Sequence, residues 1–564
     1  MFKSFRLSMT WLHTWFGLVL GFVLMVVFFF GSLSVFDREI DRWALPETRF
    51  EPREMPSFDT MLGPLFEQLE PEQGELEEAR QRVGGALPSV LPPMNWSAYT
   101  THRDPVLSLY AEFAVTNNPH DPDDHVHGNV TIDPRSGKIL PPGQLKVGSE
   151  FFYPMHYSLN LHWLDLGYWI VGLAALTMLA ALVSGVVIHR RLFRELFTFR
   201  PEKNAQRSTL DLHNLTGVVA LPFHFTFALS GLVIFASIYF PVSETLLKPM
   251  AQRHAQAEAA ANGLAVARAG VPAPRASVDA MVVEAKRRWA ARGMPGEVGW
   301  LVVNHVGDAN GYVSIYRAGS DRVTLVGQAV HFEAATGRVI REEPPPTLVA
   351  GIAEFLTGLH LQHFEHWLLR WFYVLGGLAG SVCIATGLVF FVGKRKQKHA
   401  SQGVSGARWV DALSVASITG MLVATLAILL ANRLLPADLA QKDVWERGVF
   451  WCAWLAAFAH AAWRSAPVQQ ARIAPAWREQ CWAVGSLAIA AVLSNWATTG
   501  DHLPKTLAAG YWPVAGLDLA LIAAGTVAVL VALKLRRREQ SPRLSSAAFH
   551  QPTSNASTPE AAHG

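Results

Sequence analysis

Two histidines in one apolar run are the residues of this chain whose type and spacing most directly suggest chemistry. The run opens with Asp211-Leu-His213-Asn-Leu-Thr-Gly217 and continues through His224 to Ile238, which is long enough to cross a bilayer. Ionisable side chains inside a spanning helix are costly and usually functional, and histidine is a common axial ligand of haem iron. In a straight helix the two rings would point to nearly the same side, roughly 16 Å apart.

The composition indicates a membrane protein. Apolar residues make up 51% of the 564 residues and charged residues only 16%, which is unusual for a soluble protein. Apolar runs of eighteen or more residues recur, so the chain is predicted to be polytopic. The three cysteines (Cys383, Cys452 and Cys481) lie in apolar runs. The polar loops therefore have no disulfide framework and no Cys-x-x-Cys-His haem attachment.

Apolar and polar segments alternate along the chain and define its organisation. Four strong spans are separated by two large polar segments, and four weaker spans follow. The tail is rich in Ser, Ala, Pro and Thr and is expected to be disordered. The boundaries are transmembrane helices 1–36, 161–189, 211–240 and 359–393, large polar domains 37–160 and 241–358, short connections 190–210 and 394–408, a four-helix region 409–535 and the tail 536–564.

Basic residues predict the orientation. Basic residues lie before the first span, between the second and third spans, and after the fourth span, where they form Lys394-Arg-Lys396. Loops rich in Lys and Arg stay in the cytoplasm. We therefore expect a multi-pass protein of the bacterial inner membrane, with both termini cytoplasmic and both large loops periplasmic.

The chain contains an internal repeat whose matching features run from Leu12 to Gly387. Leu12-His13-x3-Gly17 recurs as Leu212-His213-x3-Gly217. Three further matches support the repeat: Val130–Lys138 with Val330–Arg338, Leu161-His162 with Leu359-His360, and Ser184-Gly185 with Thr386-Gly387. One copy is thus a helix, an outer domain and a second helix. Repeats of this kind often place the functional site on the axis that relates them.

These features resemble a known family. A strand followed by an Asp-Pro-x-Ser/Thr-Gly-Lys turn, duplicated in outer loops between helices that open Leu-His-x3-Gly, is similar to PepSY-associated transmembrane proteins. That family includes iron-regulated inner-membrane proteins and siderophore reductases. The resemblance covers Met1 to Lys398, and it implies periplasmic PepSY domains, a four-helix membrane core and b-type haem.

The expected fold class follows from the repeat and the resemblance together. It is a polytopic α-helical membrane protein in which duplicated helix–periplasmic PepSY-like α+β domain–helix units form a four-helix core. Four additional C-terminal transmembrane helices, to which we assign no role, complete the chain.

The inner pair of candidate ligands is His13 with His213. A bis-histidine haem needs two imidazoles that approach one iron from opposite sides at the same depth, and these two residues are equivalent under the repeat. His189, at the same depth, is the reserve ligand. Gly17 and Gly217 lie one turn away on the same face. They leave room for a flat macrocycle or for close helix packing.

The outer pair of candidates is His162 with His360. His366 lies at the same level, where it is a ligand or bonds a haem propionate, and Arg370 has the forked geometry that suits a propionate. His224 lies near mid-membrane and is either a ligand or a polar residue bonded within the bundle. We expect haem b, with two groups per chain.

The favoured function is electron transfer. The sequence has no nucleotide, flavin or hydrolase motif, so electrons would come from quinol or a cytoplasmic reductase. We expect a haem b oxidoreductase of the inner membrane that passes electrons to a periplasmic acceptor. A ferric siderophore, released as ferrous iron, is the leading substrate, as in siderophore reductases. The bilayer is the other partner, and no nucleic acid is expected.

Two other functions compete with this hypothesis. One is a non-enzymatic PepSY accessory protein that binds or regulates a periplasmic peptidase or transporter, with structural or metal-binding histidines. The other is a transporter. The sequence argues against a transporter because Pro222 is a lone proline, whereas transporter repeats usually have helix breaks at matching positions.

Overall fold

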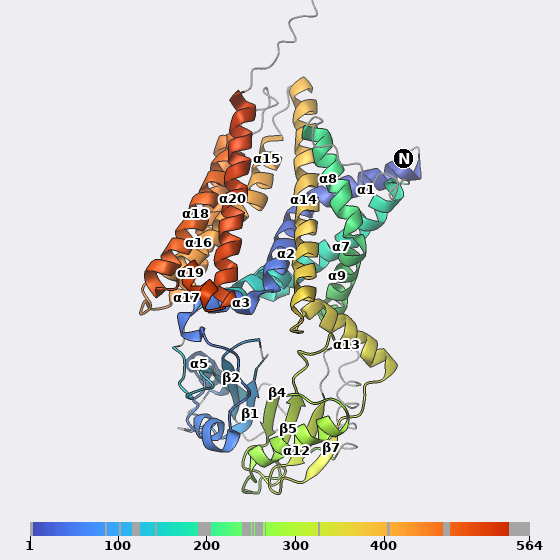
Figure 1. The fold of residues 1–564 in the computed structure, drawn as a ribbon. Coiled ribbons are helices and arrows are strands. Elements are labelled where there is room, and N and C mark those ends of the chain that lie inside the picture. Colours follow the sequence, from blue (N-terminus) through green and yellow to red (C-terminus); the bar gives the residue numbers. More distant parts are fainter. Residues whose placement is uncertain are drawn as a thin grey trace, which may run out of the picture.

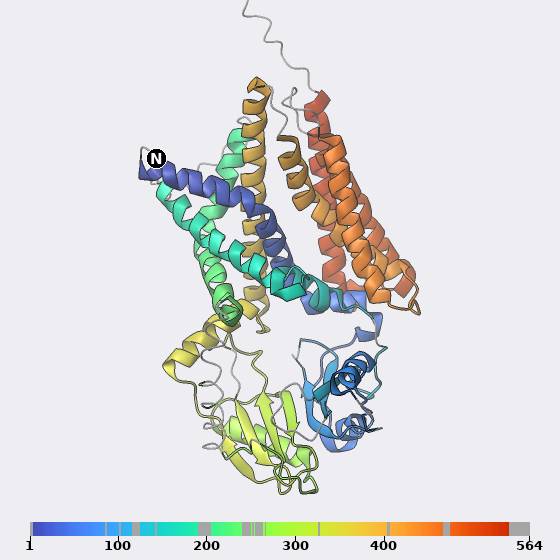
Figure 2. The ribbon, with the colours of Figure 1, turned by 180° about the vertical axis from the view of Figure 1, so that it is seen from behind.

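The structure is a computed structural model of the chain. It describes residues 4–540 apart from 85–86, 89, 101–102, 116–124, 142–143, 190–204, 240–249, 251–252, 254–262, 266, 325–327, 403–406 and 466–473. Most of the predicted disordered tail (541–564) and most of the connection 190–210 lie outside the described residues, whereas residues 536–540 continue a helix that begins at Trp512. The described part consists of a helical membrane region and one β-sheet domain below it (Figures 1 and 2).

Five described helical segments are long and apolar enough to cross a membrane, or seven if two bent helix pairs each count as one span. The straight segments are α7 (Leu166–Ile188), α14 (Trp367–Gln402), α15 to α16 (Ala407–Val415 and Met421–Leu434), α18 (Pro475–Thr499) and α20 (Trp512–Gln540). The predicted span at 449–463 belongs to α17 (Lys442–Arg464), which is absent from this set. Its first turns carry Lys442, Asp443, Glu446 and Arg447.

The helices that carry His13 and His213 are both broken, which corrects the straight helices expected. The first is α1 (Phe5–Val19) and α2 (Gly21–Ser34), bent by 63°; the second is α8 (Ala205–Val219) and α9 (Leu221–Ile234), bent by 64°. Pro222 explains the second break because it lacks the N–H that would continue the helix. The two breaks fall at equivalent positions of the repeat, so matching broken helices do exist, contrary to our argument from the lone proline.

A single seven-stranded antiparallel sheet combines both large polar segments (Figure 1). The strand order is β3-β2-β1-β4-β5-β6-β7, and the first three strands come from the first segment. The strands are β1 (Pro93–Tyr99), β2 (Leu107–Ala114), β3 (His125–Ile132), β4 (Val298–Asn304), β5 (Tyr312–Arg317), β6 (Ala329–Glu333) and β7 (Val339–Glu342). The two segments join where Tyr99 of β1 pairs with Trp300 of β4.

Helices from both segments cover one face of this sheet and share one hydrophobic core. They are α5 (Gln73–Val83), α12 (Val278–Ala291) and the short turns from Phe58 to Phe66. Asp59 accepts N–H bonds at the start of α12, and Asp279 of α12 accepts the N–H of Phe58 at 2.7 Å. The segments therefore cap each other and form a single domain rather than two independent ones.

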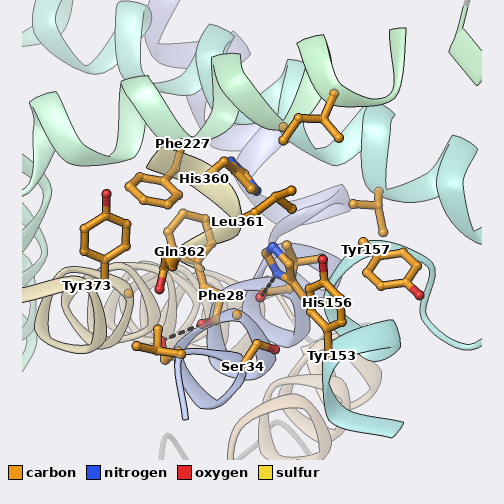
Figure 3. Close-up of a pocket in the computed structure, with 18 of the residues that line it drawn as sticks. Phe28, Ser34, Tyr153, His156, Tyr157, Phe227, His360, Leu361, Gln362 and Tyr373 are labelled. Carbon is orange, nitrogen blue, oxygen red and sulfur yellow. Dashed lines mark hydrogen bonds between the residues drawn. The ribbon is translucent and has the colours of Figure 1, made fainter. Parts of the chain in front are cut away.

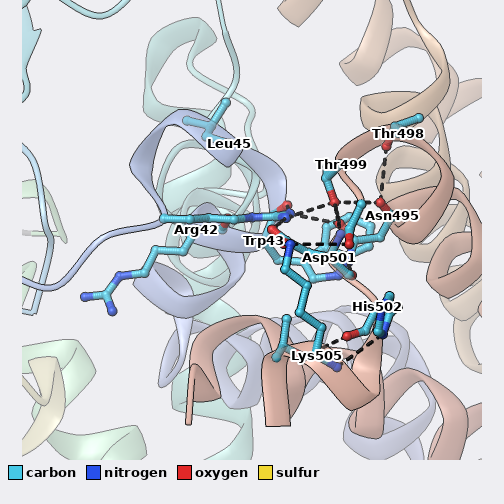
Figure 4. A network of polar contacts seen from close by, with 12 residues as sticks. Arg42, Trp43, Leu45, Asn495, Thr498, Thr499, Asp501, His502 and Lys505 are labelled. Atoms are coloured by element: carbon cyan, nitrogen blue, oxygen red, sulfur yellow. Dashed lines mark hydrogen bonds and ion pairs between the residues drawn. The ribbon is translucent and has the colours of Figure 1, made fainter. Parts of the chain in front are cut away.

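A short helix, α3 (Asp37–Ala44), joins the membrane core to the C-terminal helices (Figure 4). The indole N–H of Trp43 donates to Asp518 at 2.8 Å. The guanidinium of Arg49 donates to Asn495 at 2.8 Å and to Asp501 at 2.7 Å. Because these groups are largely buried, the C-terminal helices dock on the core through defined polar contacts.

Candidate functional site

Two cavities lie along the membrane core. The far-side cavity, at the end away from the sheet, has a volume of about 540 Å³ and is lined by His13, His189, His213 and His224. The sheet-side cavity, of about 180 Å³, is lined by His156, His360 and His363. Leu24 and Met178 line both cavities, so the two are neighbours. The sites therefore follow one another from the far side towards the sheet.

The His13 ring is fixed against α7. Its Nδ1–H donates to the carbonyl of Ala181 at 3.0 Å and lies 3.2 Å from Ser184 Oγ. The Ser184 hydroxyl itself donates to Ala181 O, so towards His13 it accepts. A Cβ on Gly185 would lie 3.5 Å from His13 Cε1, an ordinary van der Waals distance, so the ring packs against the helix at this glycine.

The His213 ring is fixed in the same way against α14. Its Nδ1–H donates to the carbonyl of Cys383 at 2.7 Å, and a Cβ on Gly387 would lie 3.1 Å from the ring. Gly185 on α7 and Gly387 on α14 are separated in sequence by nearly the same interval as the two histidines. The two sites are thus built alike.

His13 and His213 meet in the far-side cavity with ring centres 6.1 Å apart. An imidazole nitrogen binds a metal ion at about 2 Å, so two rings on opposite sides of one ion have centres roughly 6 Å apart. Since Nδ1 of each ring is used by a carbonyl, Nε2 is the nitrogen left for a ligand, and it has no hydrogen-bond partner among the described residues. This pairing is the one predicted from the sequence.

A second histidine pair lies in the sheet-side cavity (Figure 3). His156 belongs to α6 (Tyr153–Tyr157) and His360 to α13 (Leu348–Leu361). Their ring centres are 6.0 Å apart and their planes are 30° from parallel. The spacing matches that of the first pair, so both cavities hold two imidazoles at a ring-centre separation compatible with one shared metal ion.

Each ring of the second pair is anchored through Nδ1 as well. The Nδ1–H of His156 donates to the carbonyl of Val27 at 2.8 Å. That of His360 lies 2.8 Å from Ser230 Oγ, whose hydroxyl donates to a carbonyl within its own helix and therefore accepts from the ring. A Cβ on Gly31 would lie 2.7 Å from His156, and one on Gly231 would lie 3.1 Å from His360. These two glycines occupy equivalent positions of the repeat.

In the structure, the ring beside that of His360 belongs to His156 and not to His162, its predicted partner. His162 is exposed, before the turn Trp163–Asp165, and does not line the sheet-side cavity. The sequence did contain the signal, because His156-x5-His162-Trp-Leu matches His360-x5-His366-Trp-Leu. Matching the Leu-His dipeptides instead aligned His162 with His360, whereas the longer match aligns His156 with His360 and His162 with His366.

The other predicted site residues have different surroundings. His366 is exposed, and its Nδ1 accepts the N–H of Leu369 at the start of α14. The Arg370 guanidinium is buried and forms an ion pair with Glu39 at 2.8 Å, so a protein carboxylate already occupies it. His189 lines the far-side cavity beside His13, and His224 is fully buried between the cavities.

Polar groups without partners also line these cavities. Among the described residues, the Tyr373 hydroxyl and the Gln362 side-chain oxygen are buried with no hydrogen bond, and both residues line the sheet-side cavity. The far-side cavity is bordered by the cations of Lys394, Arg395 and Lys398. Each cavity therefore combines apolar walls and an imidazole pair with polar groups at its edge.

Comparisons with known proteins identify the family. The profile described as the PepSY-associated TM region matches residues 10–394, which hold all four paired histidines. An uncharacterised protein of Pseudomonas aeruginosa is 27% identical over 381 residues, covering 64% of this chain and 88% of that protein. This chain therefore belongs to the PepSY-associated transmembrane family.

Proposed function

We propose that this protein is a haem b oxidoreductase of the bacterial inner membrane that passes electrons across the bilayer to an acceptor on the side of the sheet domain. The observation that carries the proposal is the pair of imidazole sites, one in each cavity, with ring centres 6.1 and 6.0 Å apart. Histidine is a common ligand of haem iron, so these pairs would hold a b-type haem. The far-side pair is His13 with His213, and the sheet-side pair is His156 with His360.

The residues of both cavities fit a porphyrin. Each imidazole lies next to a glycine of a neighbouring helix, and at positions 31, 231 and 387 an added Cβ would come within 3.1 Å of the ring, so these glycines leave room for it. At the sheet side, the unpartnered Tyr373 hydroxyl can donate a hydrogen bond to an acidic group. The Gln362 amide can donate a second one if its side-chain nitrogen takes the place of the unpartnered oxygen. Lys394, Arg395 and Lys398 supply cations on the far side. An apolar slot with acid-binding groups at its edge matches a flat macrocycle that carries two carboxylates.

The protein positions and tunes this chemistry. When bound, haem would supply one-electron redox chemistry, and the four histidines would hold it through Nε2. The Nδ1–H bonds fix the tautomer and raise the basicity of Nε2, as is usual for metal-binding histidines. The apolar walls exclude water. A ferric siderophore is the leading acceptor, because hard oxygen donors hold ferrous iron less tightly than ferric iron.

We further propose that residues 1–398 are a duplicated helix–outer segment–helix unit on a pseudo-two-fold axis, with the two outer segments sharing one sheet. The matching helix breaks at Leu20 and Ala220 support this layout, as do the glycines and carbonyl anchors, which recur at nearly the same sequence interval as the histidines. The basic residues on α14 beyond the far-side cavity support a cytoplasmic location for that end and a periplasmic one for the sheet domain. Electrons from a quinol or a cytoplasmic reductase would enter there.

The helix breaks favour a second candidate, a transporter. Discontinuous helices in matching repeats often form substrate sites, and Gly21 and Leu221, next to the breaks, line the far-side cavity. In that case the histidines would bind a metal ion or the substrate directly.

Spectroscopy of the purified full-length protein separates these functions. From haem-replete cells we expect two haem b per chain, a reduced-minus-oxidised spectrum of low-spin bis-histidine type, and oxidation of the reduced protein by a ferric siderophore. A colourless preparation that takes up substrate into liposomes would favour the transporter. A colourless preparation without transport activity would favour the accessory protein.

A further inference from the structure

His224 lies between the two histidine pairs and has no counterpart in the other half of the protein. The equivalent position of the first repeat is Leu24. The His224 side chain is fully buried, yet it lines the far-side cavity. Its ring meets Phe28 edge-on at 5.3 Å and Phe223 at 6.0 Å, and both phenylalanines line the sheet-side cavity. His224 therefore separates the two sites.

The two ring nitrogens of His224 differ in their surroundings. Nε2 lies 3.3 Å from the carbonyl of Gly376, so it carries the hydrogen and donates. Nδ1 is buried and has no hydrogen-bond partner among the described residues. A neutral imidazole with Nε2–H leaves a bare lone pair on Nδ1. An unpartnered polar atom in an apolar interior is costly and calls for a functional explanation.

The groups packed around His224 carry no charge. α2 contributes Phe28, α9 contributes Phe223, and α14 contributes Gly376 and Gly380, where a Cβ would lie 2.9 Å from Nε2. The neighbouring titratable groups on α14 are Tyr373, whose ring contacts Phe223, and Cys383, which contacts His213. Among the described residues, no hydrogen bond or ring contact joins either of them to His224. The fixed cations of the far-side cavity, Lys394, Arg395 and Lys398, come from the last turns of α14 instead.

We propose that His224 takes up one proton when the group held by His13 and His213 gains one electron. This inference rests on the proposed haem function. An electron added in a low-dielectric interior is stabilised by a nearby positive charge. The electron comes from the reductant and the proton from water at the far side; the new bond is N–H at Nδ1, and no protein bond breaks. The proton leaves again when the electron passes on.

The far-side cavity supplies a route for that proton. One continuous cavity is lined by His224 at its inner end and by Lys394 and Lys398 near the end of α14. His189 also lines it and is a titratable group beside His13. A proton uptake that belongs to His224 must therefore be distinguished from one at His189.

Redox titration of the full-length protein at several pH values tests the proposal. Uptake of one proton per electron lowers the midpoint potential of the far-side haem by about 59 mV per pH unit, because a tenfold change in a one-electron equilibrium corresponds to about 59 mV. We expect this slope over part of the range from about pH 5.5 to 8.5. In His224→Phe and in His224→Leu, which restores the residue of the other repeat, the potential should not change with pH, whereas His189→Gln should keep the slope.

The outcomes separate this proposal from the haem assignment. Protein without haem overturns both. Protein with two haems whose slope is absent, or persists in both His224 variants, overturns only the role of His224. If both variants lose haem, infrared difference spectra of the wild-type protein with labelled histidine decide: an imidazolium signal upon reduction supports the proposal, and its absence refutes it.

Discussion

His156 and His360 face each other with ring centres 6.0 Å apart, although they come from opposite halves of the repeat. They belong to short helices at the sheet side of the membrane core, and each donates its Nδ1–H to a different spanning helix, α2 or α9. The two halves of the protein thus meet at this site, and each contributes one ring to the pair.

This arrangement predicts which histidines share a haem. His156→Ala and His360→Ala should each remove the same haem, so that haem content falls from about two per chain to about one. His13→Ala and His213→Ala should each remove the other haem. Pyridine haemochromogen content and the reduced spectrum of each purified variant measure this.

His162→Ala is the matched control for the sheet-side pair. His162 is exposed, so its variant should keep both haems. Loss of one haem in His162→Ala, together with retention of both in His156→Ala, would restore the pairing first predicted from the sequence.

Glycine at position 31 provides a test that leaves every histidine in place. A Cβ there would lie 2.7 Å from His156 Nδ1, closer than real side chains approach. Gly31→Val should therefore displace the imidazole and reduce haem content towards one per chain. Gly393→Val in α14 is the control, because a Cβ at that position meets nothing within 4 Å. Equal haem content in the two variants would show that the contact does not position His156.

Short sequence motifs predicted that His13 and His213 lie side by side, but they did not predict that His156 lies beside His360. The two Leu-His-x3-Gly motifs lie within helices, 200 residues apart, so His13 and His213 could be matched by counting residues. The outer histidines belong to α6 and α13, which differ in length, and the connections around them differ as well. A dipeptide is too short to fix the register across such a change. The longer match that includes the tryptophan does fix it.

The breaks and the shared sheet were harder to predict. Pro222 signals one break, but the other falls at Leu20 before Gly21, where apolar periodicity continues without interruption. The pairing of β1 with β4 depends on the two outer segments meeting in space. Arg49 in its loop has no sequence signature that points to Asn495 and Asp501, because those contacts join opposite ends of the chain.

The Arg49 contacts predict that the C-terminal helices stabilise the core. The Arg49 side chain is only 6% exposed and also donates to the carbonyl of Trp43 at 2.7 Å. Arg49→Ala leaves Asn495 without this donor, while Asp501 keeps Lys505. We expect the free energy of unfolding to fall by roughly 2–4 kcal/mol, somewhat less than when a fully buried ion pair is broken. This loss should appear as a lower thermal unfolding midpoint in detergent. Arg80→Ala removes an exposed pair with Glu77 and should have little effect. Equal midpoints for both variants would contradict the stabilising role.

Asp41 in α3 should make stability depend on pH. Its Oδ1 accepts the N–H groups of Gly148 and Ser149 at 2.7 and 3.2 Å, whereas its buried Oδ2 has no partner among the described residues. Burial raises the pKa of this carboxyl to about 7, compared with about 3.9 in an unfolded chain. The folded protein then binds the proton more tightly. The contribution of the protonated Asp41 carboxyl to the free energy of unfolding is complete below about pH 4, declines as the pH rises, and is lost above about pH 7.

Asp41→Asn tests this dependence because the amide keeps the Oδ1 acceptor but carries no charge. The free energy of unfolding of the variant should equal that of the wild type near about pH 4 and exceed it increasingly up to about pH 8, by on the order of a few kcal/mol. A rising thermal midpoint of the variant relative to the wild type measures this. Asp438→Asn, at an exposed position, should show no such trend. Parallel pH profiles for Asp41→Asn and the wild type would mean that Asp41 stays ionised in the folded protein, held by the cation of Arg38, whose charge opposes the effect of burial.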